Sequence, residues 1–114
     1  MNKERQITER MLIADFEKQI GSERYTDFFT ESEIARYGKR RGKGGLAARY
    51  LIKKILLENA SIEGGYTALE ILNEKSGKPV LKLQKPLFGN SENIHISISH
   101  TKHEVAVFVL ISYE

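Results

Sequence analysis

The sequence contains no cysteine and no tryptophan, and only two of its 114 residues are proline. Without cysteine the chain has no disulfide framework, no thiolate metal site and no cysteine nucleophile. Its longest apolar run, Val105 to Ile111, is far shorter than the roughly 20 residues that a membrane-spanning helix needs. The polar segment from Met1 to Arg10 lacks the hydrophobic stretch of a secretory signal. These absences predict a soluble, cytoplasmic protein.

The chain length fits one domain with a single hydrophobic core. No repeat, low-complexity tract or linker divides the sequence. We therefore expect one domain over residues 1–114, in which the sequence allows residues 1–8 to be disordered.

Positive charge is concentrated in one segment. Residues 39–54 carry seven basic side chains and no acidic one, whereas the rest of the chain carries 11 basic and 15 acidic side chains. Glycines interrupt the first part of this segment, and they let backbone amides approach an anion closely. A helix start at the same place adds positive charge, so we expect phosphate binding there by Lys43, Arg49 and Lys53. A solvated basic loop without a ligand is the alternative.

Two helices are predicted around the basic segment. Thr30 and Glu33 form a capping-box pattern, which predicts a helix over 31–37 that ends with Gly38 in the left-handed conformation. A longer helix is predicted from Leu46 to about Asn59, because apolar residues recur at helical spacing. The apolar stripe consists of Ala48, Leu51, Ile52, Ile55 and Leu56, and the basic residues off the stripe are Arg49, Lys53 and Lys54.

Strands are predicted on both sides of these helices. A first strand is expected near 9–17, and a hairpin over 67–72 and 80–83. Residues 94–99 alternate between apolar and polar, as in a half-buried strand, and the run 105–111 suits a central strand buried on both faces. This order predicts an α+β fold in which a mostly antiparallel sheet packs against the long helix.

Polar side chains that could bind a ligand or a metal ion occur on two of these predicted strands. Ser99 and His100 end one strand, where they suit an anionic ligand; the alternative is a polar strand end with one surface histidine. A serine hydrolase is disfavoured, because no Gly-x-Ser-x-Gly turn is present and adjacent residues of a strand point to opposite faces unless a bend intervenes. Asp15 and Glu17 would share a face of the first strand, and carboxylates suit magnesium.

Several motifs taken together resemble the acyl carrier protein synthase branch of the 4′-phosphopantetheinyl transferase superfamily. They are Ser76-Gly77-Lys78-Pro79, the strand Ile96 to Thr101, the following Val105-Ala106-Val107, and the helix Leu46 to Lys53. The likeness extends from about Asp15 to Ile111, and it implies a phosphopantetheinyl transferase-like fold.

The resemblance implies transfer of the phosphopantetheine arm from coenzyme A to a serine of an acyl carrier protein, as in fatty acid biosynthesis. It also implies a homotrimer with sites between subunits, and magnesium bridging the pyrophosphate. By position, Asp15 would hold the metal and Lys53 would act on a proton or a phosphate. Ser99 and His100 would lie near the phosphates of the coenzyme, which the basic residues Lys43, Arg49 and Lys54 would also contact.

Several positions depart from the family pattern, among them Ala48, Tyr50, Ile55 and Glu58. The most consequential is Lys54, which stands where the metal-binding glutamate is expected. A cation there would repel magnesium. Lys54 would then neutralise the pyrophosphate directly, or Glu17 or Glu58 would supply the missing carboxylate. Another alternative is a family member without catalysis that binds coenzyme A, a carrier protein or a partner subunit. A nucleic-acid-binding module is disfavoured, because Tyr50 is the one aromatic residue of the basic segment.

Overall fold

The computed structural model of the protein describes residues 3–39, 42–89 and 91–114. Two antiparallel sheets form its β-structure. A three-stranded sheet has the order β1-β5-β4, and a separate hairpin pairs β2 with β3. The strands are β1 (Lys3–Leu12), β2 (Leu69–Asn73), β3 (Pro79–Leu83), β4 (Asn93–His100) and β5 (Glu104–Tyr113).

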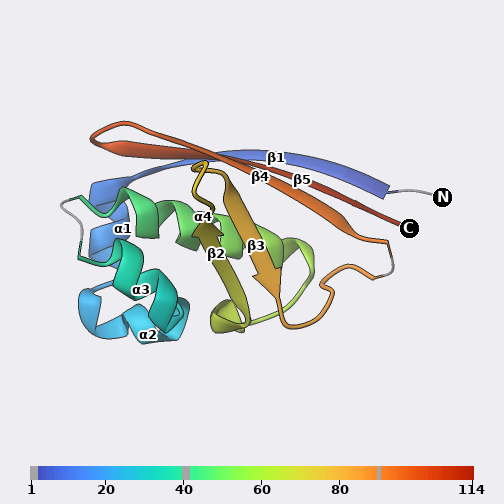
Figure 1. The fold of residues 1–114 in the computed structure, drawn as a ribbon, viewed down its shortest axis with the longest axis horizontal. Coiled ribbons are helices and arrows are strands. Elements are labelled where there is room, and N and C mark those ends of the chain that lie inside the picture. Colours follow the sequence, from blue (N-terminus) through green and yellow to red (C-terminus); the bar gives the residue numbers. More distant parts are fainter. Residues whose placement is uncertain (1–2, 40–41, 90) are drawn as a thin grey trace.

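All helices of the described segments lie on one side of the three-stranded sheet, together with the hairpin (Figure 1). None of these helices is long and apolar enough to cross a membrane. The mixed architecture, with the sheet packed against one long helix, confirms the predicted α+β class. The helices are α1 (Ile13–Gln19), α2 (Tyr25–Phe28), α3 (Glu31–Tyr37) and α4 (Gly44–Asn59), with short 3₁₀ turns at Ser22–Arg24 and Tyr66–Ala68.

The helix α3 has the predicted bounds and the predicted cap. The Thr30 hydroxyl accepts a hydrogen bond from the Glu33 amide, and the Glu33 carboxylate accepts one from the Thr30 amide. The left-handed conformation predicted for Gly38 is wrong: its φ of −74° and ψ of −23° are right-handed, and its amide donates to the Ile34 carbonyl. Gly42 has the left-handed backbone instead, with a φ of +73°.

The strand predicted over 9–17 is wrong in both bounds. Strand β1 ends at Leu12, and residues 13–19 form α1. β1 pairs with β5 along its full length, so residues 3–8 belong to this strand. The partner strand β5 is about a hundred residues away in sequence. Local sequence patterns therefore do not reveal where β1 begins and ends. In α1 the buried Ile13 and Phe16 are three residues apart, which is a helical spacing.

The core lies between α4 and the inner face of the three-stranded sheet. The inner-facing side chains of β5 are almost completely buried; they are Val105, Val107, Val109 and Ile111. The alternate residues Ala106, Phe108 and Leu110 are half-buried on the outer face, which no helix of the described segments covers (Figure 1). β5 is therefore central, as predicted, but the prediction that both of its faces are buried is wrong.

Candidate functional site

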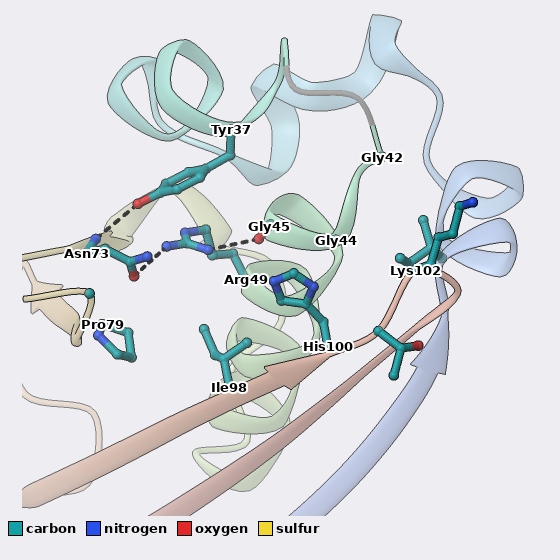
Figure 2. Close-up of a pocket in the computed structure, with 13 residues that line it drawn as sticks. Tyr37, Gly42, Gly44, Gly45, Arg49, Asn73, Pro79, Ile98, His100 and Lys102 are labelled. Carbon is teal, nitrogen blue, oxygen red and sulfur yellow. Dashed lines mark hydrogen bonds between the residues drawn. The ribbon is translucent and has the colours of Figure 1, made fainter.

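A cleft of about 640 Å³ lies where three segments meet: the start of α4, the turn between β2 and β3, and the end of β4. We call it the Arg49 cleft. Its polar lining residues are Tyr37, Arg49, Asn73, His100, Thr101 and Lys102 (Figure 2). The glycine-rich loop, the Gly77–Pro79 turn and the strand end at His100 are the segments that carry the sequence motifs, and the fold brings all three to one cleft.

The start of α4 forms one wall of this cleft through Gly44 and Gly45. The Cβ of a larger residue at position 44 would lie 3.6 Å from Nδ1 of His100, and one at position 45 would lie 3.2 Å from Cδ1 of Tyr37. The first amides of a helix have no partner within it and carry its positive end. This wall therefore offers backbone donors to an anion, with the His100 ring beside them (Figure 2).

The Arg49 side chain is only 2% exposed and is held by several partners. Its guanidinium donates to the carbonyls of Ile71 at 2.7 Å and Gly45 at 3.0 Å, and to Oδ1 of Asn73 at 3.0 Å. Its Cζ lies 3.5 Å from the centre of the Tyr37 ring. The sequence pattern placed Arg49 off the buried stripe, but the structure buries it in the floor of the cleft, where it supplies fixed positive charge.

Lys53, the predicted catalytic lysine, is completely buried. It lines neither the Arg49 cleft nor the second cleft, which lies between β1, α1 and α4. Its ammonium donates to Oε1 of Glu33 at 2.6 Å and to the Phe28 carbonyl at 2.9 Å. Burial lowers the pKa of Lys53, and the Glu33 carboxylate opposes this shift. The second Glu33 oxygen accepts the Ile71 amide at 2.9 Å. Lys53 therefore joins α4 to α3 and β2, and it is buried although it lies off the predicted apolar stripe.

The other basic residues of the 39–54 segment are dispersed. The Lys43 ammonium donates to the Gly38 carbonyl and closes the loop before α4. Lys39 is exposed, and the predicted cations at positions 40 and 41 lie outside the described residues. Because Arg49 and Lys53 are buried, the described residues of this segment do not form one continuous cationic surface.

A second cleft of about 350 Å³, which we call the Asp15 cleft, lies between the end of β1, α1 and α4. Asp15 and Lys54 both line it, together with Tyr50. The Lys54 ammonium lies 3.7 Å from Oε1 of Glu58, one helical turn further along α4. The other charged lining residues are Glu9, Arg10 and Glu104.

Four predicted site residues line neither cleft: Lys43, Lys53, Ser99 and Glu17. Ser99 pairs with Ala106 on the outer face of the sheet, whereas its neighbour His100 faces the Arg49 cleft. Glu17 lies on α1, where residues two apart point to different sides of the helix. The prediction that Asp15 and Glu17 share the face of a strand is therefore wrong.

Comparison with known proteins identifies the family. No protein-family model matches the chain. The holo-[acyl-carrier-protein] synthase of Chloroherpeton thalassium is 41% identical to it over 100 residues, which cover 78% of this chain and 82% of that protein. The chain belongs to the holo-[acyl-carrier-protein] synthase family. The synthase of Thermodesulfovibrio yellowstonii is 30% identical over 98 residues and 83% of each chain.

Solved holo-[acyl-carrier-protein] synthases share this fold. The Bacillus anthracis protein, in complex with CoA (3',5'-ADP), matches with a TM-score of 0.75, 20% identity and coverage of 96% of both chains. The Helicobacter pylori protein, in complex with coenzyme A, matches with a TM-score of 0.73, 18% identity and coverage of 94% of this chain and 99% of its own. The resemblance inferred from the sequence motifs is thereby confirmed.

The Asp15 cleft of this holo-[acyl-carrier-protein] synthase family member does not fit a divalent cation. Magnesium requires oxygen ligands in near-octahedral geometry. Within the described segments, no three histidine or carboxylate side chains are grouped so as to hold a metal ion. Lys54 lines the cleft beside Asp15, and Glu58, which contacts Lys54, does not line it. Glu9 and Glu104 also line the cleft, but within the described segments they are not grouped with Asp15 as three ligands of one ion.

Sequence reasoning missed several residues of the site. Tyr37 and Asn73 line the Arg49 cleft, and the backbone amide of Asn73 donates a hydrogen bond to the Tyr37 hydroxyl at 3.0 Å. No local pattern marks either residue as a partner of Arg49. Glu33 was recognised as a helix cap, but its second role as the partner of buried Lys53 depends on tertiary contacts.

Proposed function

We propose that the protein transfers the 4′-phosphopantetheine arm of coenzyme A to a serine of an acyl carrier protein. The observation that carries this proposal is the 41% identity to a holo-[acyl-carrier-protein] synthase across most of both chains. The convergence of the three motif segments on the Arg49 cleft supports it independently. We also treat residues 1–114 as one domain.

The Arg49 cleft is the proposed site for the nucleotide part of coenzyme A. Its volume of about 640 Å³ is in the range of small-molecule sites. Positive groups suited to phosphates surround it: the start of α4, Arg49 and Lys102, with His100 as a further donor. Pro79 and Ile98 add apolar surface that suits a flat aromatic base. Of the predicted coenzyme-binding residues, Arg49 and His100 line this cleft, whereas Lys43, Lys54 and Ser99 do not.

A homotrimer with sites between subunits remains our proposal for the assembly. The outer face of the three-stranded sheet is free of helices in the described segments and carries the half-buried apolar residues Phe108 and Leu110 (Figure 1). A second copy packed there would remove this apolar surface from water. The cytoplasmic location and the part in fatty acid biosynthesis also stay predictions.

The alternative function is that of a family member without catalysis that binds coenzyme A or a carrier protein. Two points support it. Lys53 is bound to Glu33 in the core. Lys54, which lines the Asp15 cleft, stands where the sequence resemblance implies a metal-binding glutamate. Binding through the Arg49 cleft requires neither residue. The two functions therefore predict the same affinity for coenzyme A and different outcomes with a carrier protein.

The test combines transfer with binding. The protein is mixed with coenzyme A and an apo acyl carrier protein, and the mass increase of the carrier is measured; calorimetry gives the affinity for coenzyme A. Transfer is expected with the wild-type protein, and binding without transfer would favour the alternative function. His100→Ala should weaken coenzyme A binding by roughly tenfold, as expected for one hydrogen bond to a charged group.

His95→Ala is the matched control for the binding measurement. His95 is an exposed imidazole on the same strand, but it pairs with Leu110 on the outer face and does not line the Arg49 cleft. Its replacement should leave the affinity for coenzyme A unchanged. Equal effects of the two histidine substitutions would contradict the placement of coenzyme A in this cleft.

A further inference from the structure

We propose that Tyr37 is a positioning residue of the Arg49 cleft, and that it holds the Arg49 guanidinium in the orientation in which it meets the anionic part of coenzyme A. The inference rests on the binding site proposed above. It gives a role to a buried aromatic side chain that lines the cleft and that no sequence motif marks. In this role Tyr37 acts on the ligand through Arg49.

The Tyr37 ring packs against the Arg49 guanidinium. The Arg49 Cζ lies 3.5 Å from the ring centre, and the two side chains are only 4% and 2% exposed. An aromatic face attracts a guanidinium electrostatically, and the attraction is stronger where water is excluded. The ring is neutral, so this contact restrains the guanidinium on one side without removing its charge.

The Tyr37 hydroxyl fixes a second partner of Arg49. It accepts a hydrogen bond from the backbone amide of Asn73 at 3.0 Å, and Oδ1 of Asn73 accepts one from Nη2 of Arg49 at 3.0 Å. Asn73 is the last residue of β2, so the hydroxyl holds the end of this strand beside the guanidinium (Figure 2). One tyrosine thus restrains Arg49 directly through its ring and indirectly through Asn73.

The start of α4 leaves room for this ring. A Cβ on Gly45 would lie 3.2 Å from Cδ1 and 3.3 Å from Cβ of Tyr37, which is closer than ordinary van der Waals contact. The Gly45 carbonyl also accepts a hydrogen bond from Nη1 of Arg49 at 3.0 Å. The ring, the glycine and the guanidinium therefore form one packed unit, and a side chain at position 45 would push the ring aside.

A fixed guanidinium is an advantage for binding an anion. Ordering a long side chain on binding costs conformational entropy, and this cost is avoided where the fold has already ordered it. Lys102, the exposed cation of the same cleft, is a flexible side chain and has to be ordered by the ligand. Arg49 is ordered by its contacts with Tyr37 and Asn73, so it sets the direction from which the cleft attracts an anion.

The test compares a charged probe with an uncharged one, adenosine 3′,5′-bisphosphate and adenosine, by calorimetry. Tyr37→Leu should weaken bisphosphate binding roughly tenfold, as expected for the loss of one contact to a charged group, and change adenosine binding less than about twofold. Tyr37→Phe keeps the ring and should lose less affinity for the bisphosphate than Tyr37→Leu. Urea unfolding shows that each variant is folded. Equal losses for the two probes would mean that Tyr37 only shapes the cleft, which would overturn the inference.

A double-mutant cycle separates action through Arg49 from direct contact with the ligand. In an Arg49→Met background, Tyr37→Leu should change bisphosphate affinity less than about twofold, because the residue through which it acts is already gone. The same loss in both backgrounds would show that Tyr37 contacts the ligand itself, and would refute a positioning role. Gly45→Ala tests the inference without replacing either side chain: it displaces the ring and should weaken binding of the bisphosphate more than that of adenosine. Unchanged bisphosphate binding by Gly45→Ala would also count against the inference.

Tyr113→Leu is the matched control. Tyr113 is a half-buried tyrosine whose ring centre lies 5.8 Å from the Lys3 ammonium, and it lines neither the Arg49 cleft nor the Asp15 cleft. Its replacement should leave both affinities unchanged. Absence of coenzyme A binding by the wild-type protein would overturn the proposed binding site and this inference with it. Wild-type binding that Tyr37→Leu leaves unchanged would overturn this inference alone.

Discussion

The ammonium of Lys53 lies 2.6 Å from Oε1 of Glu33, and neither side chain has any exposed surface. The ion pair joins α4 to the cap of α3, and through the Ile71 amide it also reaches β2. One buried interaction thus fixes three elements that surround the Arg49 cleft. Lys53 therefore holds these elements together, and it does not line the Arg49 cleft.

Lys53→Met should destabilise the protein by about 3–5 kcal/mol, because it leaves the Glu33 carboxylate buried without its partner. The double variant Lys53→Met with Glu33→Gln should recover part of the loss, since the uncompensated charge is then removed. Urea unfolding gives both free energies. Lys82→Met, on an exposed residue, should change stability by less than about 0.5 kcal/mol. A stable Lys53→Met variant that had lost coenzyme A binding would instead indicate a ligand-binding lysine.

Phe108→Glu should separate the proposed homotrimer into monomers. Phe108 is half-buried on the outer face of the central strand, so a carboxylate there would be forced against a neighbouring copy while the inner face keeps its packing. Light scattering after size-exclusion chromatography gives the mass. Val80→Glu is the control, because it places the same charge on an exposed apolar residue of β3. A monomeric wild-type protein at working concentrations would refute the proposed assembly.

Alkaline pH should destabilise the fold through Tyr66. Burial raises the pKa of Tyr66 above its usual 10.0, and neighbouring Tyr50 and Glu58 raise it further. The unfolded chain therefore loses the Tyr66 proton first, so the contribution is complete below about pH 10 and is lost as the pH rises through the folded pKa. Tyr66→Phe should lose less stability than the wild-type protein above about pH 10. Parallel stability curves of the two proteins would count against this assignment.

Comparison with a single variant matters in that experiment because other groups titrate nearby. Burial also raises the pKa of Tyr25, which acts in the same direction as Tyr66. The lowered pKa of Lys53 acts in the opposite direction, since the folded state then loses its proton before the unfolded chain does. The difference between wild type and Tyr66→Phe isolates the contribution of the one hydroxyl.

The sequence by itself determined the elements whose signals are local. The capping box of Thr30 and Glu33 located α3, and the apolar stripe located α4, because both depend on residues within a few helical turns. Strict alternation placed Ser99 and His100 on opposite faces of β4, as the structure has them. The order of the motifs also indicated the family, which the curated relatives confirm.

Only the tertiary structure decided where the charged residues lie. A one-dimensional pattern treats lysine and arginine as surface residues, but Glu33 and Ile71 provide distant partners that allow Lys53 and Arg49 to be buried. The extent of β1 likewise depends on pairing with β5 at the other end of the chain. Burial and pairing are properties of contacts between segments that are remote in sequence. For this reason only the structure could show that Arg49 and Lys53 of the basic segment are buried, whereas Lys54 remains partly exposed and lines the Asp15 cleft.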